Sequence, residues 1–176
     1  PGGKWRWVLY DTDFGFAGQW WSDWDQYYSY FFDTLDFVLS GNQTTWANPQ
    51  WATLFMRKLV QNVGFRNKFI NRYADEMNTR YLPTNVTSHF IGIYENMYDE
   101  MSNHIVRWNE SEPWVSEESV YQFVDNMNNF AANRQPEAKY HILNQFDLDS
   151  YHEIVLFNET PELGYVILNN NLKIQD

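Results

Sequence analysis

Cysteine is absent from the 176-residue sequence, which excludes disulfide bonds, thiolate zinc sites and a cysteine nucleophile. Any metal ion would therefore have to bind to oxygen or imidazole ligands. The sequence also lacks an uninterrupted run of about 18 apolar residues, so it predicts no membrane-spanning helix. Positive charge is scarce, because 12 Lys and Arg residues stand against 23 Asp and Glu residues, a net charge of −11. This charge would repel a phosphate backbone, and we expect no nucleic acid partner.

Apolar and aromatic side chains, in contrast, are abundant. Hydrophobic residues make up 44% and aromatic residues 19% of the chain, which is enough to form a core and excludes intrinsic disorder. The length is typical of one domain with a small extension.

The N-terminal part of the chain predicts strands and a loop rather than helix. Residues 4–10 alternate large apolar and other side chains, which is typical of a buried strand. The stretch 19–30 has neither helical nor alternating periodicity and predicts an irregular loop. Residues 32–40 predict a short strand before the turn at Gly41.

The middle of the chain predicts helices. Asn48 and Pro49 form an N-cap and first-turn pair, and apolar residues at helical spacing then predict a helix over 49–61. The same pattern predicts a second helix over 65–77. Pro83 is expected to end that helix or to follow its end shortly.

Three further helices are predicted after Pro83. An apolar stripe over 86–108 predicts the longest helix, which is expected to be the spine of the core. Ser116 is placed to cap the next helix, with acidic residues in its first turn. A shorter helix is expected after Pro136, running to Phe146.

The C-terminal end changes in character. Residues 152–175 consist of short apolar runs separated by turn-rich segments, which predict a small antiparallel sheet. The expected fold is therefore mainly α, of the α+β class: a helical bundle with a short N-terminal strand and a small C-terminal sheet. We divide it into residues 1–148, the main domain, and residues 149–176, a β segment that either extends this domain or starts a following one.

Asp11 and Asp13 are the strongest candidates for metal ligands in the sequence. Asp11 and Asp13 follow directly after the predicted strand 4–10 and precede Gly15. If the strand geometry continues, side chains two residues apart point to the same side. Carboxylate oxygens are hard ligands suited to magnesium, and a strand end holds them rigidly. The alternative is that these carboxylates only cap the loop by accepting backbone hydrogen bonds.

Four segments together resemble the CotH (spore coat protein H) kinase-like family of secreted, atypical protein kinases. The resemblance covers roughly residues 5–146, and the order and approximate spacing of the segments fit. The matching segments are 7–15 (WVLYDTDFG), 55–62 (FMRKLVQN), 65–79 (FRNKFINRYADEMNT) and 100–108 (EMSNHIVRW).

The resemblance implies a fold and an activity. The bundle would correspond to the C-terminal lobe of a kinase-like fold, and the activity would be transfer of phosphate from ATP to Ser or Thr of extracytoplasmic proteins. Asp11 would bind Mg²⁺ or Mn²⁺, with Asp13 in a supporting role. The implied partner is a protein substrate, and the implied location is secreted or in the cell envelope.

The resemblance also implies residues that this chain lacks. The nucleotide-binding strands, the phosphate-contacting Lys and the catalytic Asp of the family precede the Asp-x-Asp strand, whereas only ten residues precede Asp11 here. We therefore expect a C-terminal fragment whose partner is the upstream half of the same protein. The isolated chain is expected to be inactive.

Polar residues in the helical segments could line the substrate side of the cleft. Their alternative role is in ion pairs at helical neighbour spacing, such as Arg72 with Asp75 or Glu76, and Glu100 with His104. The candidates for the cleft are Arg66, Arg72, Asn78, His104 and Arg107.

The aromatic stretch 20–32 supports an alternative function. Exposed Trp20, Trp21 and Trp24 could bind a carbohydrate or a protein, which would make the chain a non-catalytic extracellular binding module. In that case Asp11-Thr12-Asp13 would be only a structural turn. If these tryptophan side chains are buried, their role is only to pack in the protein core.

Overall fold

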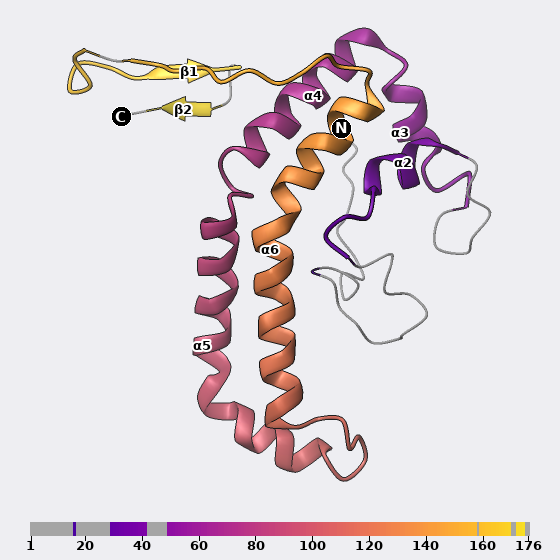
Figure 1. Ribbon diagram of the computed structural model, residues 1–176, viewed down its shortest axis with the longest axis vertical. Coiled ribbons are helices and arrows are strands. Elements are labelled where there is room, and N and C mark those ends of the chain that lie inside the picture. The colour runs from indigo at the N-terminus through magenta and orange to yellow at the C-terminus, as the bar shows by residue number, and fades with distance from the viewer. Residues whose placement is uncertain (1–15, 17–28, 42–48, 158, 170–171, 175–176) are drawn as a thin grey trace, which may run out of the picture. The chain divides into compact units, whose positions relative to one another are not determined.

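The computed structural model describes residues 16, 29–41, 49–157, 159–169 and 172–174. These residues form five helices and two short strands, which confirms the expectation of a mainly helical fold (Figure 1). The predicted strand 4–10 lies outside the described residues. None of the described helices is long and apolar enough to cross a membrane.

The chain divides into two compact units. Unit 1 comprises Pro1–Phe32 and Val86–Arg134, and unit 2 comprises Asp33–Asn85 and Gln135–Asp176. Each unit is therefore assembled from two segments that are far apart in the sequence.

The expected strand over 32–40 is wrong, because this segment contains the helix α2 (Thr34–Leu39). Asp33 is its N-cap, and the Asp33 side chain accepts a hydrogen bond from the backbone N–H of Asp36 at 2.9 Å. Gly41 follows with a φ of 67°, a left-handed conformation that is typical of a residue just past a helix end. The apolar residues alone fit either period, and the cap decides for helix.

The helix expected over 49–61 is shorter in the structure, where α3 covers Leu54–Leu59 and turns precede it. Its N-cap residue, Thr53, makes no side-chain capping bond. Trp51 and Phe55 are 77% and 72% exposed, so the apolar stripe that suggested a longer helix is not stabilised by burial.

The next helix follows the prediction closely. Helix α4 covers Val63–Met77, and the Asn62 side chain caps it by accepting a hydrogen bond from the Phe65 N–H at 3.0 Å. Pro83 begins the following helix, α5 (Pro83–Trp108), where its missing N–H costs nothing. The rings of Phe69 in α4 and Phe146 in unit 2 pack edge to face at 6.0 Å.

Helix α5 is not the core spine that its apolar stripe predicted. Phe90 is its buried residue, whereas Ile93 and Met97 are 50% and 49% exposed. In unit 1 the Phe16 ring lies 6.4 Å from the Phe90 ring and 5.6 Å from the Phe130 ring. Burial is therefore concentrated near the N-terminal part of α5.

Helix α6 (Glu117–Gln145) has 29 residues and exceeds the 26 of α5, so the prediction of the longest helix was wrong. Ser116 caps it as expected: the Ser116 hydroxyl accepts from the Ser119 N–H at 3.2 Å, and the Ser119 hydroxyl accepts from the Ser116 N–H at 3.0 Å. This reciprocal pairing satisfies two N–H groups at the helix start.

The expected break at Pro136 does not occur, because Pro136 lies inside α6. Contacts with other parts of each unit hold the helix on both sides of the proline and outweigh the lost backbone hydrogen bond. In unit 2, Gln135 Nε2 donates to the Met77 carbonyl at 2.6 Å, and the Tyr73 hydroxyl donates to the Ala138 carbonyl at 3.3 Å.

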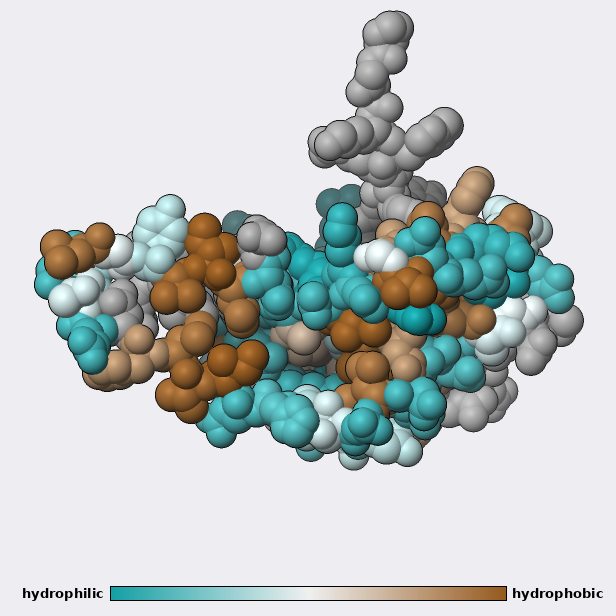
Figure 2. All heavy atoms as spheres, turned by 90° about the horizontal axis from the view of Figure 1, so that it is seen from above, coloured by the Kyte–Doolittle hydropathy of each residue, from teal (hydrophilic) through white to brown (hydrophobic). Residues whose placement is uncertain are grey.

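The C-terminal segment contains less sheet than expected. Residues 151–157 are irregular, and the strands are limited to β1 (Val166–Leu168) and β2 (Leu172–Ile174), paired antiparallel. Val155 and Phe157 are 81% and 84% exposed, so these strand-favouring residues have no burial to stabilise a strand. Hydrophobic residues also reach the surface at several places on the face shown in Figure 2.

One hydrogen bond joins this hairpin to α4. Asp75 in α4 is only 5% exposed, and its Oδ1 accepts a hydrogen bond from Asn169 Nδ2 at 2.9 Å. Asn169 follows β1 in the left-handed region, with a φ of 54°, which asparagine tolerates better than most residues. The buried carboxyl group therefore anchors the hairpin within unit 2.

Two substitutions of Asn169 should separate the contribution of its hydrogen bond to Asp75 from that of its left-handed backbone conformation. Asn169→Gly keeps the left-handed backbone but loses the bond to Asp75, and we expect a loss of about 1 kcal/mol in the free energy of unfolding. Asn169→Ala also strains the backbone and should cost about 1 kcal/mol more. Urea unfolding measures both changes, and wild-type stability in both variants would contradict this anchor.

The cap of α4 gives a second prediction. Asn62→Ala removes the acceptor for the Phe65 N–H and should destabilise unit 2 by about 1 kcal/mol. Asn67→Ala is the matched control: Asn67 is exposed inside α4, where alanine is the better helix former. Equal stability of the two variants in urea would show that the cap contributes nothing.

Candidate functional site

The predicted metal ligands and the alternative ligand-binding tryptophans lie outside the described residues. These are Asp11, Asp13, Trp20, Trp21 and Trp24. Among the residues that the structure does describe, no group of three or more His, Asp or Glu side chains could hold a metal ion.

Arg66 and Arg72 lie on α4, and the structure places Arg72 in an ion pair. Its Nη2 is 2.5 Å from Glu76 Oε1, and Arg80 Nη1 approaches the same oxygen at 3.5 Å. Of the two partners expected for Arg72, Glu76 is therefore the one observed, while Asp75 is buried and binds Asn169. Six helical positions turn the chain by about 600°, so Arg66 and Arg72 point to different sides of α4.

His104 and Arg107 lie near the C-terminal end of α5. The Arg107 guanidinium carbon is 5.2 Å from the centre of the Trp108 ring, a distance that suits a cation–π contact. Glu100, expected to pair with His104, accepts a hydrogen bond from Asn103 at 3.1 Å. A cleft-lining role for Arg66, Arg72, His104 and Arg107 stays a prediction.

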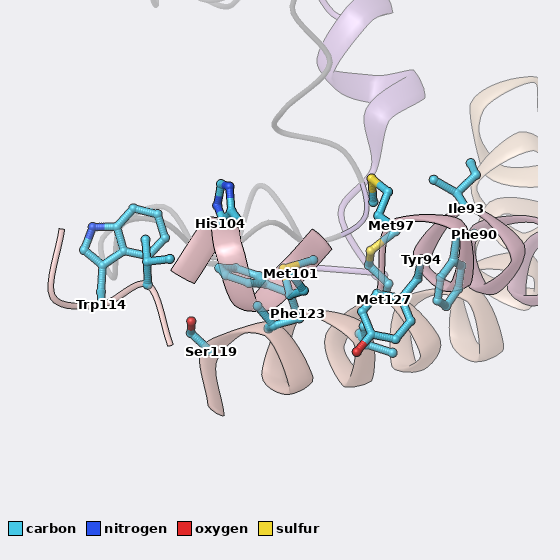
Figure 3. A pocket seen from close by; sticks show the side chains of 13 residues that line it. Phe90, Ile93, Tyr94, Met97, Met101, His104, Trp114, Ser119, Phe123 and Met127 are labelled. Atoms are coloured by element: carbon cyan, nitrogen blue, oxygen red, sulfur yellow. The ribbon is translucent and has the colours of Figure 1, made fainter. Parts of the chain in front are cut away.

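His104 does line a cavity, which we call the apolar cavity. It lies in unit 1, has a volume of about 360 Å³, and is bordered by α5, α6 and the segment between them. Figure 3 shows His104 and Trp114 toward one end and Phe90 with Ile93 toward the other. Its lining residues are Phe90, Ile93, Tyr94, Met97, Met101, His104, Trp114, Val115, Ser119, Val120, Phe123, Val124 and Met127.

The helical spacing of the sequence explains how this cavity forms. Residues 90, 93, 94, 97, 101 and 104 fall on one stripe of α5, and residues 120, 123, 124 and 127 fall on one stripe of α6. Val115, which is 6% exposed, also lines the cavity, next to the Ser116 cap. The two stripes face each other but leave Met97 and Trp114 about half exposed.

A second cavity, which we call the tyrosine pocket, shares Tyr94, Met101 and Val120 with the first. It has a volume of about 200 Å³ and is more polar. Its other lining residues are Tyr98, Asp99, Ser102, Ile105, Glu117 and Tyr121. The two cavities adjoin along the seam between α5 and α6.

The hydroxyl groups in the tyrosine pocket interact. A hydrogen bond to Tyr98 raises the pKa of the Tyr121 phenol above its ordinary value, and the nearby charges of Tyr98, Tyr94 and Glu117 add to the rise. The rings of Tyr94 and Tyr98 are 5.8 Å apart in an edge-to-face arrangement. The pocket therefore offers phenol hydroxyl groups and aromatic faces beside the carboxylates of Asp99 and Glu117.

Sequence reasoning missed this pocket. The signal was present, because Tyr94 and Tyr98 stand one helical turn apart, and Tyr121 falls in the first turns of α6. Periodicity marked Tyr94 as a core residue, but it carried no information on which α6 residue would lie opposite.

Comparison with known proteins adds an independent finding. The family model described as CotH kinase protein matches residues 1–137, which include Asp11, Asp13 and all but the last turns of α6. No match was found among curated proteins or among solved structures. Since the family model covers more than half of the chain, this protein belongs to the CotH kinase protein family.

Proposed function

We propose that this chain forms the metal-binding and helical part of a CotH-type protein kinase, which transfers phosphate from ATP to Ser or Thr residues of extracytoplasmic proteins. The observation that carries this proposal is the family match over residues 1–137, which includes the Asp11-Thr12-Asp13 segment. A non-catalytic binding module based on Trp20, Trp21 and Trp24 gains no support from that match.

The proposed ligands suit the metal that phosphoryl transfer needs. Asp11 and Asp13 supply hard carboxylate oxygens, and a chain without cysteine offers no soft thiolate ligands. When bound, Mg²⁺ or Mn²⁺ would neutralise charge on the ATP phosphates. Asp11 would hold the ion, and Asp13 would assist as a second ligand or by orienting it.

Positioning of the nucleotide requires further residues. The family resemblance puts a phosphate-contacting Lys and the catalytic Asp upstream of the Asp-x-Asp strand, and we propose that the upstream half of the same protein supplies them. We also propose that the kinase-like domain ends near residue 148 and is followed by the β segment 149–176, which Asn169 joins to α4. Arg66, Arg72, His104 and Arg107 are the proposed contacts to the protein substrate.

The carboxylate of Asp11 gives the direct test. In the complete protein that contains this chain, Asp11→Ala should lower Mn²⁺- or Mg²⁺-dependent phosphate incorporation from ATP at least about 100-fold, because the metal loses its main ligand. Glu153→Ala is the control, since it removes the same charge at an exposed position and should leave the rate unchanged. Full activity of Asp11→Ala would refute the metal-binding role.

The need for upstream residues is tested with the 176-residue chain itself. We expect its phosphate incorporation with MgATP to be below about 1% of that of the complete protein, since phosphoryl transfer depends on positioning by all of the nucleotide contacts. Radiolabelled ATP with the protein itself and casein as acceptors measures both. Comparable rates would show that the upstream half is dispensable.

A further inference from the structure

The apolar cavity is open at a surface where large side chains are left partly uncovered by the described residues. Ile93, Met97 and Trp114 are 50%, 49% and 48% exposed, and the cavity of about 360 Å³ has a volume typical of ligand sites. Methionine side chains are flexible and polarisable, and they are common on surfaces that accommodate apolar side chains of varied shape. This surface therefore suits an apolar face of another polypeptide.

The charge around the cavity is strongly one-sided. Residues 86–134 contain eight Asp and Glu side chains against Arg107 and Arg134. Arg107 lies over the Trp108 ring, and Arg134 donates to two backbone carbonyls in unit 1, those of Tyr30 and Phe32. Both cations are thus engaged within the chain, and the surface attracts positive charge.

The tyrosine pocket adds a place for one such positive charge. Asp99 and Glu117 line it together with three tyrosines and no Lys or Arg. Aromatic faces attract cations through their quadrupole, and carboxylates pair with ammonium or guanidinium groups. Because this pocket adjoins the apolar cavity, one ligand can reach both.

We propose that α5 and α6 bind a partner protein through a basic amphipathic segment, whose apolar side chains enter the apolar cavity and whose Lys or Arg enters the tyrosine pocket. An amphipathic helix laid in a hydrophobic groove is a recurring mode of such recognition. The inference does not depend on the proposed phosphoryl transfer, because it uses only the geometry and charge of unit 1.

Charge disfavours the other occupants. Residues 17–28 of this chain are rich in tryptophan, but they contain Asp23 and Asp25 and no Lys or Arg. A second copy of the chain carries a net charge of −11 and would be repelled, as would an anionic membrane. A cationic protein segment is the occupant that complements both cavities.

A pair of designed peptides tests the proposal with the complete 176-residue chain. The probe is a fluorescein-labelled 18-residue amphipathic helix of Leu, Trp and Lys, and its control replaces every Lys with Glu. Fluorescence anisotropy at about 0.1 M salt should show the Lys peptide binding at least ten-fold more tightly than the Glu peptide. Failure of the Lys peptide to bind would overturn the proposal.

Matched variants distinguish binding by the carboxylates of the tyrosine pocket from attraction by the overall negative charge. Asp99→Asn with Glu117→Gln should weaken the Lys peptide about five-fold, which corresponds to two partly exposed ion pairs. Glu95→Gln with Asp125→Asn makes the same change in net charge at exposed positions that line neither cavity, and should weaken it less than two-fold. Equal weakening by the two pairs would overturn the proposal.

The apolar cavity is tested separately. Met97→Gln keeps the length of the side chain but makes it polar, and it should weaken the Lys peptide at least three-fold. A triple replacement of Trp20, Trp21 and Trp24 by Ser should leave binding unchanged. If the peptide binds only after that replacement, the chain's own tryptophans occupy the groove and the proposal is wrong.

Discussion

Helix α6 runs through Pro136 and supplies residues to both units, so each unit depends on its own part of this helix. Residues of α6 up to Arg134 belong to unit 1, and residues from Gln135 onward belong to unit 2. The proline removes one backbone donor inside the helix, and polar side chains next to it compensate by binding carbonyl groups elsewhere in their own units. Arg134 binds the carbonyls of Tyr30 and Phe32, and Gln135 binds that of Met77.

Sparse burial is the second general property of the described residues. The buried side chains include small and polar ones, such as Ala131, Ala138 and His141. Large apolar residues of α5 and α6 instead border the open cavities. Caps, side-chain bonds to carbonyl groups and a few ring contacts therefore carry more of the stability, and the apolar faces of α5 and α6 stay partly exposed.

The sequence predicted best those features that depend on residues close together in the chain, such as where helices begin. The Ser116 cap and the apolar period after it predicted α6, and the apolar period over 65–77 predicted α4; both predictions are confirmed, whereas the cap at Asn62 was not predicted. The segment 32–40 was misassigned because its apolar pattern fits a strand, whereas the Asp33 cap favours a helix. Pro136 was misread because contacts distant in sequence stabilise the helix around it.

Predicting the site from the sequence was limited in a different way. The family resemblance and the Asp-x-Asp pair pointed to residues 11 and 13, and the family match supports the resemblance. Periodicity identified the apolar stripe of α5, but a stripe shows only which residues share a face. Whether Met97 is covered, and whether Tyr98 meets Tyr121, depends on the packing of α5 against α6.

The hairpin anchored on Asp75 shows that family boundaries and folding boundaries differ in this protein. The family match ends at residue 137, yet Ala138, His141 and Ile142 are among the most buried residues of unit 2. Asn169, still further along, supplies a hydrogen bond to a carboxyl group inside α4. Recombinant versions cut at the family limit would therefore expose apolar surface and deprive an interior acid of one donor, which favours aggregation over a clean loss of function.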